Sequence, residues 1–461
     1  MSLLRWRQKI QQQGAPVLRE DKTAKSAFLK QLDFQLTDAQ TRVASEINKD
    51  IDSAVPMLRL VQGDVGSGKT VVAAMAALQA IANGKQAALM APTEILADQH
   101  RQNFEHWFKP LGIEVTWLTG KIKGKARALK LSAIADGTAQ MVIGTHALFQ
   151  ETVEFNDLGL SIIDEQHRFG VHQRLALRQK GFVPTLSKET SGSAPHQLIM
   201  TATPIPRTLA MSAYADLDCS IIDELPPGRK PVDTLVLNNL RRNDVIERVR
   251  ASCVNGRQAY WVCTLIEESD VLEAQAAEVT ASELQLLLPE LSIGLIHGRL
   301  KPREKLEIME AFKNGTINLL VATTVIEVGV DVPNASLMII ENSERLGLSQ
   351  LHKLRGRVGR GTEASHCVLL YSAPLSGNGN ARLKIMRETT DGFKIAEKDL
   401  ELRGPGEVLG TRQTGNMQLH IADLQRDAHM LPDIKIIAET LLVNYPENVD
   451  ELVHLHFRIV E

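Results

Sequence analysis

The stretch Leu58-Arg59-Leu60-Val61-Gln62-Gly63-Asp64-Val65-Gly66-Ser67-Gly68-Lys69-Thr70 decides the fold. An apolar strand enters a glycine-rich turn and continues into an alanine-rich helix expected over 71–81, which is the G-x-x-x-x-G-K-T pattern of a phosphate-binding loop. Glycine permits positive φ angles and close backbone approach, so successive N–H groups can surround phosphates. We expect Lys69 to reach the outer phosphates and Thr70 to contact Mg²⁺. The residues expected to surround the phosphates are Gly63, Gly66, Ser67 and Gly68.

Length and composition place the chain among ordinary globular proteins. Its 461 residues suggest two to four domains, and 44% apolar with 23% charged residues is typical of a folded protein. A formal net charge of −3 provides no global basic field, so any nucleic-acid contact must be local. The four cysteines form no CxxC pair and are expected to be reduced thiols. No secretory or membrane-spanning segment is apparent, which predicts a cytoplasmic protein without a membrane partner.

Apolar runs alternate with helical patterns twice along the chain, which predicts two α/β lobes with parallel sheets. Only the first series contains a phosphate-binding loop. The first series of expected strands is 58–61, 86–90, 115–118, 141–144, 160–163 and 197–201. The second series is 259–262, 293–296, 318–322, 337–340 and 367–370.

Charged stretches and the positions of proline and glycine suggest the domain boundaries. A basic N-terminal stretch is expected to form a helical connector, whose apolar stripe, which includes Leu4, needs a packing partner either upstream or on the lobes. The proline-rich segment that begins at Pro226 is expected to be a stiff linker. The expected divisions are connector 1–31, first lobe 32–225, linker 226–233, second lobe 234–375 and a C-terminal helical and loop element 376–461.

Two carboxylates follow a buried run in the first series. The run 160–163 leads into Asp164 and Glu165, where a parallel sheet opens its binding crevice. Asp164 can hold Mg²⁺ and Glu165 can orient or deprotonate water, and phosphoryl transfer requires both charge neutralisation and a positioned nucleophile. A solvated helix cap is the alternative. After a phosphate-binding loop, the catalytic interpretation is favoured.

The order of the remaining motifs resembles the superfamily 2 helicases. Asp164-Glu165-Gln166-His167 precedes Thr201-Ala202-Thr203-Pro204, and the segment 34–40 resembles the family's adenine-contacting segment, with Gln40 as the base reader. The resemblance implies two RecA-like lobes that use ATP and Mg²⁺. It also implies that three motif residues couple ATP to DNA, namely His167, Thr201 and Thr203.

Segments after several expected strands resemble the family's DNA-backbone loops. Ala91-Pro92-Thr93-Glu94 and Gly144-Thr145-His146 belong to the first lobe, and the motif 322–331 belongs to the second. Hydroxyl and backbone N–H groups there can bind phosphate oxygens without reading bases, although a cap or turn role is the alternative for each threonine. The threonines concerned are Thr93, Thr145, Thr323 and Thr324. The resemblance also makes Gly329 and Asp331 nucleotide contacts.

Two arginines stand on the lobe without a phosphate loop. Arg355-Gly356-Arg357-Val358-Gly359-Arg360-Gly361 resembles the family's last helicase motif. Delivered across a cleft, Arg357 and Arg360 can stabilise transition-state charge on the transferred phosphoryl group and require the cleft to close. When this stretch is considered without the other motifs, the alternative interpretation is an arginine-rich surface turn.

A closer resemblance, to the RecG family of DNA helicases, covers nearly the whole chain. It rests on Asp164 to Val171, on Thr203 to Ala210 and on Asp399 to Gly415, the last similar to a translocation motif in which Arg403 and Gln413 occupy the key positions. The resemblance implies an ATP-dependent helicase that remodels stalled forks and Holliday junctions in recombination and repair. It implies a monomer with double-stranded and branched DNA as partners, and a single-stranded-DNA-binding protein as a further partner.

Two departures from the family pattern leave alternatives open. Lys353 stands where the superfamily has glutamine, and the residues before Phe34 leave no room for the family's N-terminal wedge domain, as in a motor without its wedge. One alternative function is a duplex translocase of the transcription-repair coupling type. Others are a nucleotide-gated DNA-binding fragment without productive unwinding and an RNA remodeller.

Overall fold

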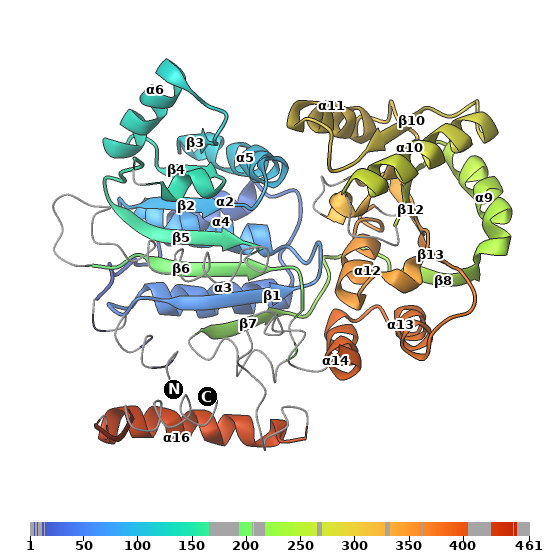
Figure 1. The fold of residues 1–461 in the computed structure, drawn as a ribbon. Helices are drawn as coiled ribbons and strands as arrows, with labels where there is room; N and C mark the ends of the chain where they lie inside the picture. The colour runs from blue at the N-terminus through green and yellow to red at the C-terminus, as the bar shows by residue number, and fades with distance from the viewer. Residues whose placement is uncertain are drawn as a thin grey trace. The chain divides into compact units, whose positions relative to one another are not determined.

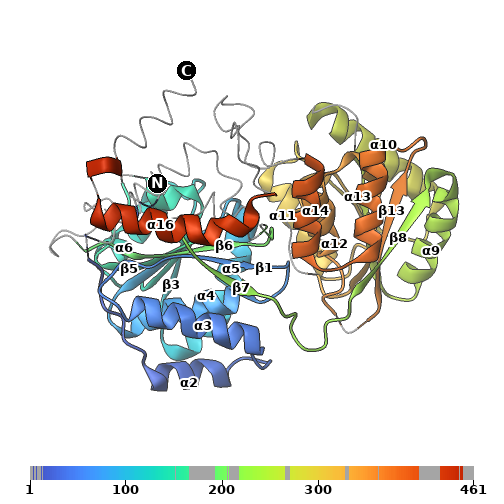
Figure 2. The ribbon, with the colours of Figure 1, turned by 90° about the horizontal axis from the view of Figure 1, so that it is seen from below.

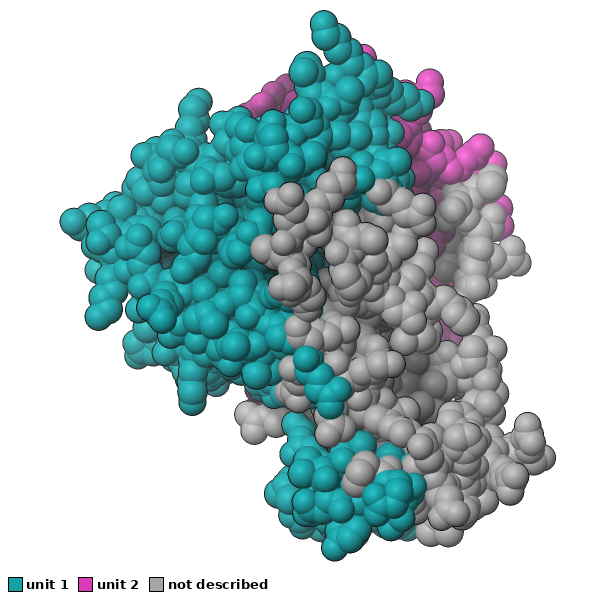
Figure 3. Space-filling view, turned by 90° about the vertical axis from the view of Figure 1, so that its left-hand side faces the viewer, with its two compact units in different colours: residues 1–63, 68–224, 403–461 teal, residues 64–67, 225–402 magenta. Residues whose placement is uncertain are grey.

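The computed structural model describes residues 4, 7, 12, 14–150, 152–165, 193–204, 206, 217–264, 270–327, 332–361, 363–403, 426–445 and 447–449. The chain divides into two compact units, coloured separately in Figure 3. Unit 1 comprises Met1–Gly63, Gly68–Glu224 and Arg403–Glu461. Unit 2 comprises Asp64–Ser67 and Leu225–Leu402. Each unit is described by itself below.

Unit 1 is built on a seven-stranded parallel sheet in the order β3-β4-β2-β5-β6-β1-β7 (Figure 1). Its central strands are buried on both faces, as expected for a parallel sheet covered by helices on both sides. The strands are β1 (Leu58–Gly63), β2 (Gln86–Met90), β3 (Val115–Leu118), β4 (Met141–Gly144), β5 (Leu158–Asp164), β6 (His196–Thr201) and β7 (Asp218–Ile222).

Helices α2 to α5 supply one apolar layer against this sheet, and the views in Figures 1 and 2 show α2, α3 and α4 close together. The alanine-rich α4 is buried along most of its length because small side chains let it pack closely between its neighbours. A second apolar cluster, which includes Ile134 of α6, uses other residues of the sheet. The helices are α2 (Lys22–Lys30), α3 (Asp38–Ile51), α4 (Lys69–Ala82), α5 (Glu94–Phe108), α6 (Gly124–Ala135) and α16 (Leu431–Asn444).

The N-terminal stripe finds a partner within unit 1. Leu4 is buried with Ala438 and Leu442 of α16, and Arg7 forms an ion pair of 2.7 Å with Asp218 at the start of β7. The sequence left open whether this stripe packs upstream or on the lobes. Leu4 packs on α16.

Unit 2 has a six-stranded parallel sheet in the order β10-β11-β9-β12-β13-β8. Its strands are β8 (Val232–Asn238), β9 (Gln258–Val262), β10 (Ile293–Ile296), β11 (Leu319–Ala322), β12 (Ala335–Ile340) and β13 (Ser365–Tyr371). Its helices are α9 (Arg242–Val254), α10 (Asp270–Leu287), α11 (Pro302–Lys313), α12 (Leu348–Arg355), α13 (Gly377–Glu388) and α14 (Gly392–Arg403). The short 3₁₀ helices of both units are η1 (Lys109–Leu111), η2 (His146–Phe149), η5 (Asn239–Arg241), η6 (Thr324–Glu327), η7 (Ser343–Arg345) and η9 (Ala428–Met430).

The two parallel sheets confirm the predicted α/β class, and every predicted strand is present within two residues of its expected ends. Two strands were missed. The edge strand β7 is short, and β8 starts at Val232, inside the stretch assigned to the linker. Both strands are only partly buried and therefore lack the continuous apolar run that marks the others.

The cysteines behave as the sequence predicted. All four are free thiols, of which Cys219 is exposed and the other three are buried. Burial raises the pKa of Cys253, Cys263 and Cys367 to about 12, because a thiolate is poorly solvated in an apolar interior. In the part of the chain that the structure describes, no helix is long and apolar enough to span a membrane.

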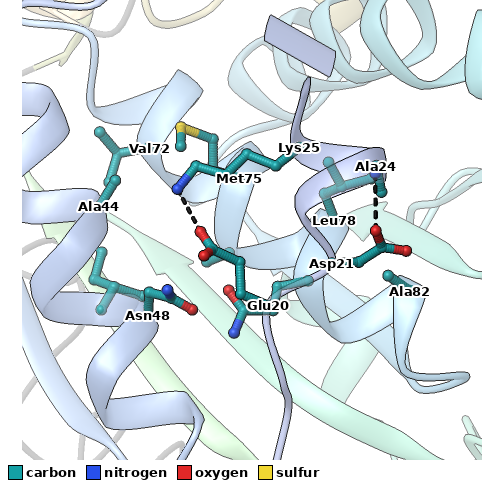
Figure 4. A pocket seen from close by; sticks show the side chains of 13 residues that line it. Glu20, Asp21, Ala24, Lys25, Ala44, Asn48, Val72, Met75, Leu78 and Ala82 are labelled. Carbon is teal, nitrogen blue, oxygen red and sulfur yellow. Dashed lines mark hydrogen bonds and ion pairs between the residues drawn. The ribbon is translucent and has the colours of Figure 1, made fainter. Parts of the chain in front are cut away.

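A small cavity of about 30 Å³ lies among α2, α3 and α4 (Figure 4). Glu20 and Lys25 form an ion pair beside it, and Val72, Met75 and other side chains line its wall. This volume corresponds to one or two water molecules, not a nucleotide. The cavity is therefore a packing defect behind α4, separate from the phosphate-binding loop at the start of that helix.

Candidate nucleotide and DNA site

Three neighbouring strands of unit 1 bring the predicted motifs to one edge of the sheet. β6 pairs with β5 on one side and with β1 on the other. In this register Asp164 lies opposite Met200, and Thr201 lies opposite Gln62. Because all three strands are parallel, their carboxyl ends meet at the same edge, where α/β proteins bind ligands. The phosphate-binding loop, the carboxylates and the Thr201 motif are therefore adjacent.

The phosphate-binding loop has the backbone that its glycines require. Gly66 and Gly68 adopt left-handed φ angles of 79° and 84°, whereas Gly63 is the last residue of β1 and makes no use of a positive φ. No side chain caps the start of α4, so its first N–H groups remain oriented for an anion. The Lys69 Nζ donates to the Gly63 carbonyl over 2.6 Å and must leave this contact to reach a phosphate. Thr70 follows in the first helical turn.

Gln40 contacts the phosphate-binding loop. It forms a capping box at the start of α3, in which its Oε1 accepts from Thr37 N–H over 3.0 Å and Thr37 Oγ1 accepts from the N–H of Gln40 over 3.1 Å. Its Nε2 lies so close to Gly68 that a Cβ there would be only 2.2 Å away. The glutamine predicted to read adenine thus also supports the loop, and Gly68 is required for that approach.

Asp164 is the last residue of β5, and His100 contacts it. The His100 Nε2 lies 2.8 Å from Asp164 Oδ2, with only 6% of the histidine and 8% of the aspartate exposed. A carboxylate accepts, so Nε2 carries the proton. The sequence analysis did not select His100. The available signal was a polar residue in the buried stripe Ala97, His100, Phe104 and Phe108 of α5.

Glu165 turns away from the strand into the neighbouring motif. Its φ of 54° is left-handed, which is uncommon for glutamate, and its N–H donates to Met200 O over 2.9 Å. Its Oε1 accepts from the Ala202 N–H over 3.1 Å. Thr201 Oγ1 in turn accepts from Thr203 N–H over 3.1 Å. The predicted catalytic carboxylate is therefore fixed by the motif predicted to couple ATP to DNA.

The residues present fit a magnesium ion. Asp164 offers a carboxylate oxygen, and Thr70 offers a hydroxyl oxygen, both hard donors of the kind that Mg²⁺ prefers. Magnesium ions in nucleotide sites are held by one or two protein oxygens together with phosphates and water. Among the described residues, no group of three or more histidine, cysteine or acidic side chains could hold a metal ion by itself. This donor set therefore fits an ion that arrives with a nucleotide.

The two threonines predicted to face DNA in unit 1 follow neighbouring strands. Met90 of β2 pairs with Gly144 of β4, so the turns after these strands are adjacent. Thr93 caps α5, its Oγ1 accepting from Leu96 N–H over 3.4 Å, and Thr145 precedes η2 with 4% of its surface exposed. The cap role considered from sequence is thus real for Thr93. The backbone N–H groups of both turns lie at the same edge of the sheet.

The motif residues of unit 2 differ in exposure. Thr323, directly after β11, is 1% exposed, while Thr324 begins η6 and is half-buried. Arg357 and Arg360 are also half-buried, and Arg360 Nε donates to the Gly356 carbonyl over 3.3 Å. Lys353, which departs from the family pattern, is 6% exposed within α12.

Arg229 donates hydrogen bonds to three backbone carbonyls within unit 2. Its Nε donates to Gly359 O over 3.1 Å, its Nη2 donates to Gly356 O over 3.3 Å and its Nη1 donates to Val65 O. A Cβ at Gly66 would lie 2.2 Å from the same Nη1. One guanidinium group thus contacts both the loop segment 64–67 and the motif that contains Arg357.

A second polar chain runs through the same segment of unit 2. Arg355 Nη2 donates to His352 Nδ1 over 3.1 Å, so His352 carries its proton on Nε2, which lies 3.1 Å from Asp64 Oδ1. Arg355 also donates to Met386 O and Thr389 O, and burial lowers its pKa. Arg355 is therefore a structural group. The sequence analysis missed Arg229, His352 and Arg355, because no pattern marks contacts between segments so far apart.

Some predicted site residues lie outside the described residues. They are His167, Gly329, Asp331 and Gln413. Arg403 is the last residue of α14, and only its backbone is described.

Comparison with known proteins matches this geometry to helicases. Residues 37–212 match the DEAD/DEAH box helicase family, 242–362 match the helicase conserved C-terminal domain, and 389–455 match the C-terminal part of domain 3 of the ATP-dependent DNA helicase RecG. Two parallel-sheet lobes with one phosphate-binding loop and these motifs define a superfamily 2 helicase motor. A structure of S. cerevisiae Dbp5 shares the fold, with 14% identity, a TM-score of 0.58 and coverage of 92% of this chain and 98% of that one.

Closer relatives narrow the class. The ATP-dependent DNA helicase RecG of Escherichia coli strain K12 is 63% identical over 98% of this chain and 64% of its own length. RecG of Aquifex aeolicus is 45% identical over 98% of this chain and 57% of its own length. A structure of RecG bound to a three-way DNA junction has a TM-score of 0.75 and 41% identity, covering 93% of this chain and 55% of that one. Over nearly its whole length the chain is similar to the RecG helicases.

The chain spans about two thirds or less of these relatives. The activity, substrates and partners of the whole relatives are therefore carried to this chain as proposals.

Proposed function

We propose that the chain hydrolyses ATP to move along double-stranded DNA and that it remodels branched DNA such as stalled forks and Holliday junctions. The observation that supports this most strongly is the meeting of the phosphate-binding loop, Asp164 and Glu165 at one edge of the unit 1 sheet. The 63% identity to RecG of Escherichia coli strain K12 and the 41% identical RecG bound to a three-way DNA junction support the choice of substrate.

Different residues of unit 1 bind the phosphates of ATP, hold the metal ion and activate water. Lys69 leaves the Gly63 carbonyl and contacts the outer phosphates, while the uncapped N–H groups of α4 bind phosphate oxygens. Asp164 and Thr70 would hold Mg²⁺, which when bound would supply charge neutralisation. Glu165, fixed by the Ala202 N–H, orients the attacking water and accepts its proton.

The residues of unit 2 complete the proposal. Arg357 and Arg360 stabilise charge on the transferred phosphoryl group, as arginine fingers do. Their loss is expected to lower turnover by about a thousandfold or more. Thr93, Thr145, Thr323 and Thr324, with the backbone around them, grip DNA phosphates without reading bases. Arg403 and Gln413 transmit motion to the duplex.

Further partners belong to the same proposal. A single-stranded-DNA-binding protein is a partner that stalled forks would provide, and the chain acts as a monomer. Gel filtration with light scattering tests the monomer. A pull-down of this chain by the immobilised single-stranded-DNA-binding protein, with empty resin as the control, tests whether the two proteins bind. A cytoplasmic location follows from a DNA substrate and completes the proposal.

The direct experiment compares steady-state ATP hydrolysis on forked DNA, linear duplex, single-stranded RNA and no nucleic acid. The proposal predicts the largest stimulation by forked DNA and no turnover in Lys69→Ala. Stimulation by RNA above duplex DNA would support an RNA remodeller instead. Nucleotide binding without turnover would support a nucleotide-gated DNA-binding protein.

A further inference from the structure

His100 is a polar residue in an otherwise apolar helix face. It lies on α5 between Ala97 and Phe104, which are both 0% exposed, and is itself 6% exposed. Burying an imidazole without a hydrogen-bond partner is destabilising, so packing alone does not favour histidine here. The position would suit a leucine or methionine if it served only the core. The polar atoms of His100 therefore need an explanation.

The explanation lies in the contact with Asp164. Within the described part of the chain, His100 Nδ1 is buried without a hydrogen-bond partner, so the bond from Nε2 to Asp164 Oδ2 is the polar contact that fixes the ring. In turn, the bond engages Oδ2, so Oδ1 is the oxygen that would bind a metal ion. A histidine that orients a metal-binding carboxylate in this way typically changes metal affinity by 10–100-fold when it is replaced.

The same helix begins at the proposed DNA contact. Thr93 is the N-cap of α5, and His100 follows seven residues later, about 10 Å along the helix axis at 1.5 Å per residue. A DNA phosphate bound at this N-terminus would contact the free N–H groups of the first turn. Movement of α5 on binding would then displace His100 Nε2 and, through it, the carboxylate of Asp164.

Several side-chain contacts stiffen helix α5 around and beyond His100. Arg101 forms ion pairs of 2.7 Å with Asp98 and with Glu105, one turn before and one turn after it, and its guanidinium lies 5.1 Å from the ring centre of Trp117. In the buried stripe of the helix, Phe104 and Phe108 pack edge to face with ring centres 5.2 Å apart. These contacts favour movement of the helix as one body.

We propose that His100 is a positioning residue that couples DNA bound at the start of α5 to the orientation of the metal-facing carboxylate of Asp164. The coupling rests on the proposed function, because it requires DNA at Thr93. The orientation of Asp164 by His100 requires no DNA. The two parts can therefore be tested separately.

The experiment uses His100→Ala, His100→Gln and His106→Ala in the full chain. Glutamine retains an N–H donor, and His106 is an exposed histidine on the same helix, so its variant is a matched control. The first measurement is the Mg²⁺ dependence of binding of a fluorescent non-hydrolysable ATP analogue without DNA. We expect His100→Ala to raise the half-saturating Mg²⁺ concentration about tenfold, His100→Gln to recover part of this loss and His106→Ala to match the wild type. An unchanged Mg²⁺ dependence in His100→Ala would overturn the positioning role.

The second measurement is the ratio of ATP turnover with forked DNA to turnover without it. We expect His100→Ala to lower this ratio at least fivefold at saturating Mg²⁺, while His106→Ala keeps the wild-type ratio. An unchanged ratio in His100→Ala refutes the coupling. Absence of stimulation in the wild type refutes the proposed function, while the Mg²⁺ measurement still decides the role of His100 at Asp164.

A measurement on the wild type covers the case in which the alanine variant does not fold. Nitrogen-15 labelled histidine gives an imidazole N–H signal for a buried ring that exchanges slowly with solvent, and its absence from His100→Gln assigns it. Adding duplex DNA without nucleotide is expected to shift this signal. A signal that stays unchanged at saturating DNA contradicts the coupling.

Discussion

The backbone N–H of Ala202 donates a hydrogen bond to Glu165 Oε1 over 3.1 Å and so joins the ends of two neighbouring strands, β5 and β6. Glu165 has a left-handed φ of 54°, a backbone conformation that is uncommon for glutamate and needs support from its surroundings. The contact therefore fixes a carboxylate whose position determines where water is activated.

Removing the Thr201 hydroxyl, which supports the turn at Ala202, should slow ATP hydrolysis more than it weakens ATP binding. Thr201→Val deletes the Oγ1 that accepts from Thr203 N–H, while Thr201→Ser keeps a hydroxyl. We expect Thr201→Val to lower kcat for ATP about tenfold, the loss of about one hydrogen bond, with KM within twofold of the wild type. Steady-state kinetics on forked DNA measures both constants. Equal kcat values in the valine and serine variants would exclude this role for Thr201.

A methyl group at Gly68 should damage the nucleotide site through a clash as well as through backbone strain. Its φ is +84°, and an added Cβ would lie 2.2 Å from Gln40 Nε2. Gly84 is the matched control, because its φ is +74° and nothing lies within 4 Å of an added Cβ. Gly84→Ala should cost about 1 kcal/mol of unfolding free energy. We expect Gly68→Ala to cost more and to weaken nucleotide binding at least tenfold, as measured by urea unfolding and fluorescence titration.

Arg229 should affect ATP binding through its contact with the segment 64–67. Arg229 contacts the carbonyls of Val65, Gly356 and Gly359 through three different nitrogens. An ammonium group cannot match this planar fork, so Arg229→Lys is expected to raise the KM for ATP several-fold with little change in melting temperature. The exposed neighbour Lys230 supplies the control, because Lys230→Ala should leave KM unchanged. A wild-type KM in Arg229→Lys would show that the fork is dispensable.

His196 should make the stability of the chain depend on pH. Its Nδ1 accepts from Met57 N–H over 3.0 Å, its Nε2 donates to Pro16 O over 2.8 Å, and burial lowers its pKa from the ordinary value of 6.5. The unfolded chain therefore takes up a proton first as the pH falls. The stability that neutral His196 contributes is complete above about pH 6.5 and is lost as the pH falls from there toward the folded pKa.

Urea unfolding at pH 8.0 and at pH 5.5 measures this effect. The wild type should lose more unfolding free energy between these pH values than His196→Gln, which cannot titrate. The glutamine variant should be less stable than the wild type at pH 8.0, because glutamine does not reproduce both hydrogen bonds. The same pH dependence in both proteins would assign it to other groups.

Most strand positions along the chain and the main motifs could be predicted because each has a local signal. A buried strand such as β5 is a continuous apolar run, and the loop from Gly63 to Thr70 has a fixed spacing that phosphate chemistry imposes. The partly buried β8 has no such run and follows a proline-rich segment, so its start at Val232 was assigned to the linker.

Contacts between distant segments carry no local signal. His100 and Asp164 are 64 residues apart, and Arg229 lies 164 residues from Val65. Only the strand order and the helix packing bring each pair together. The positive φ at Glu165 was also unpredictable, because a glutamate gives no sign of a left-handed backbone. The residues proposed to act on ATP could therefore be selected from sequence, whereas His100 and Arg229, which contact them or their loop, could not.

The most direct test of the account is ATP hydrolysis by Glu165→Gln in the presence of forked DNA, with nucleotide binding measured on the same sample. The account predicts nucleotide affinity within a few-fold of the wild type and turnover reduced at least a thousandfold, because the amide keeps the shape of Glu165 but cannot accept the proton of the attacking water. Turnover within tenfold of the wild type would contradict the central claim that Glu165 activates water at the edge of the unit 1 sheet.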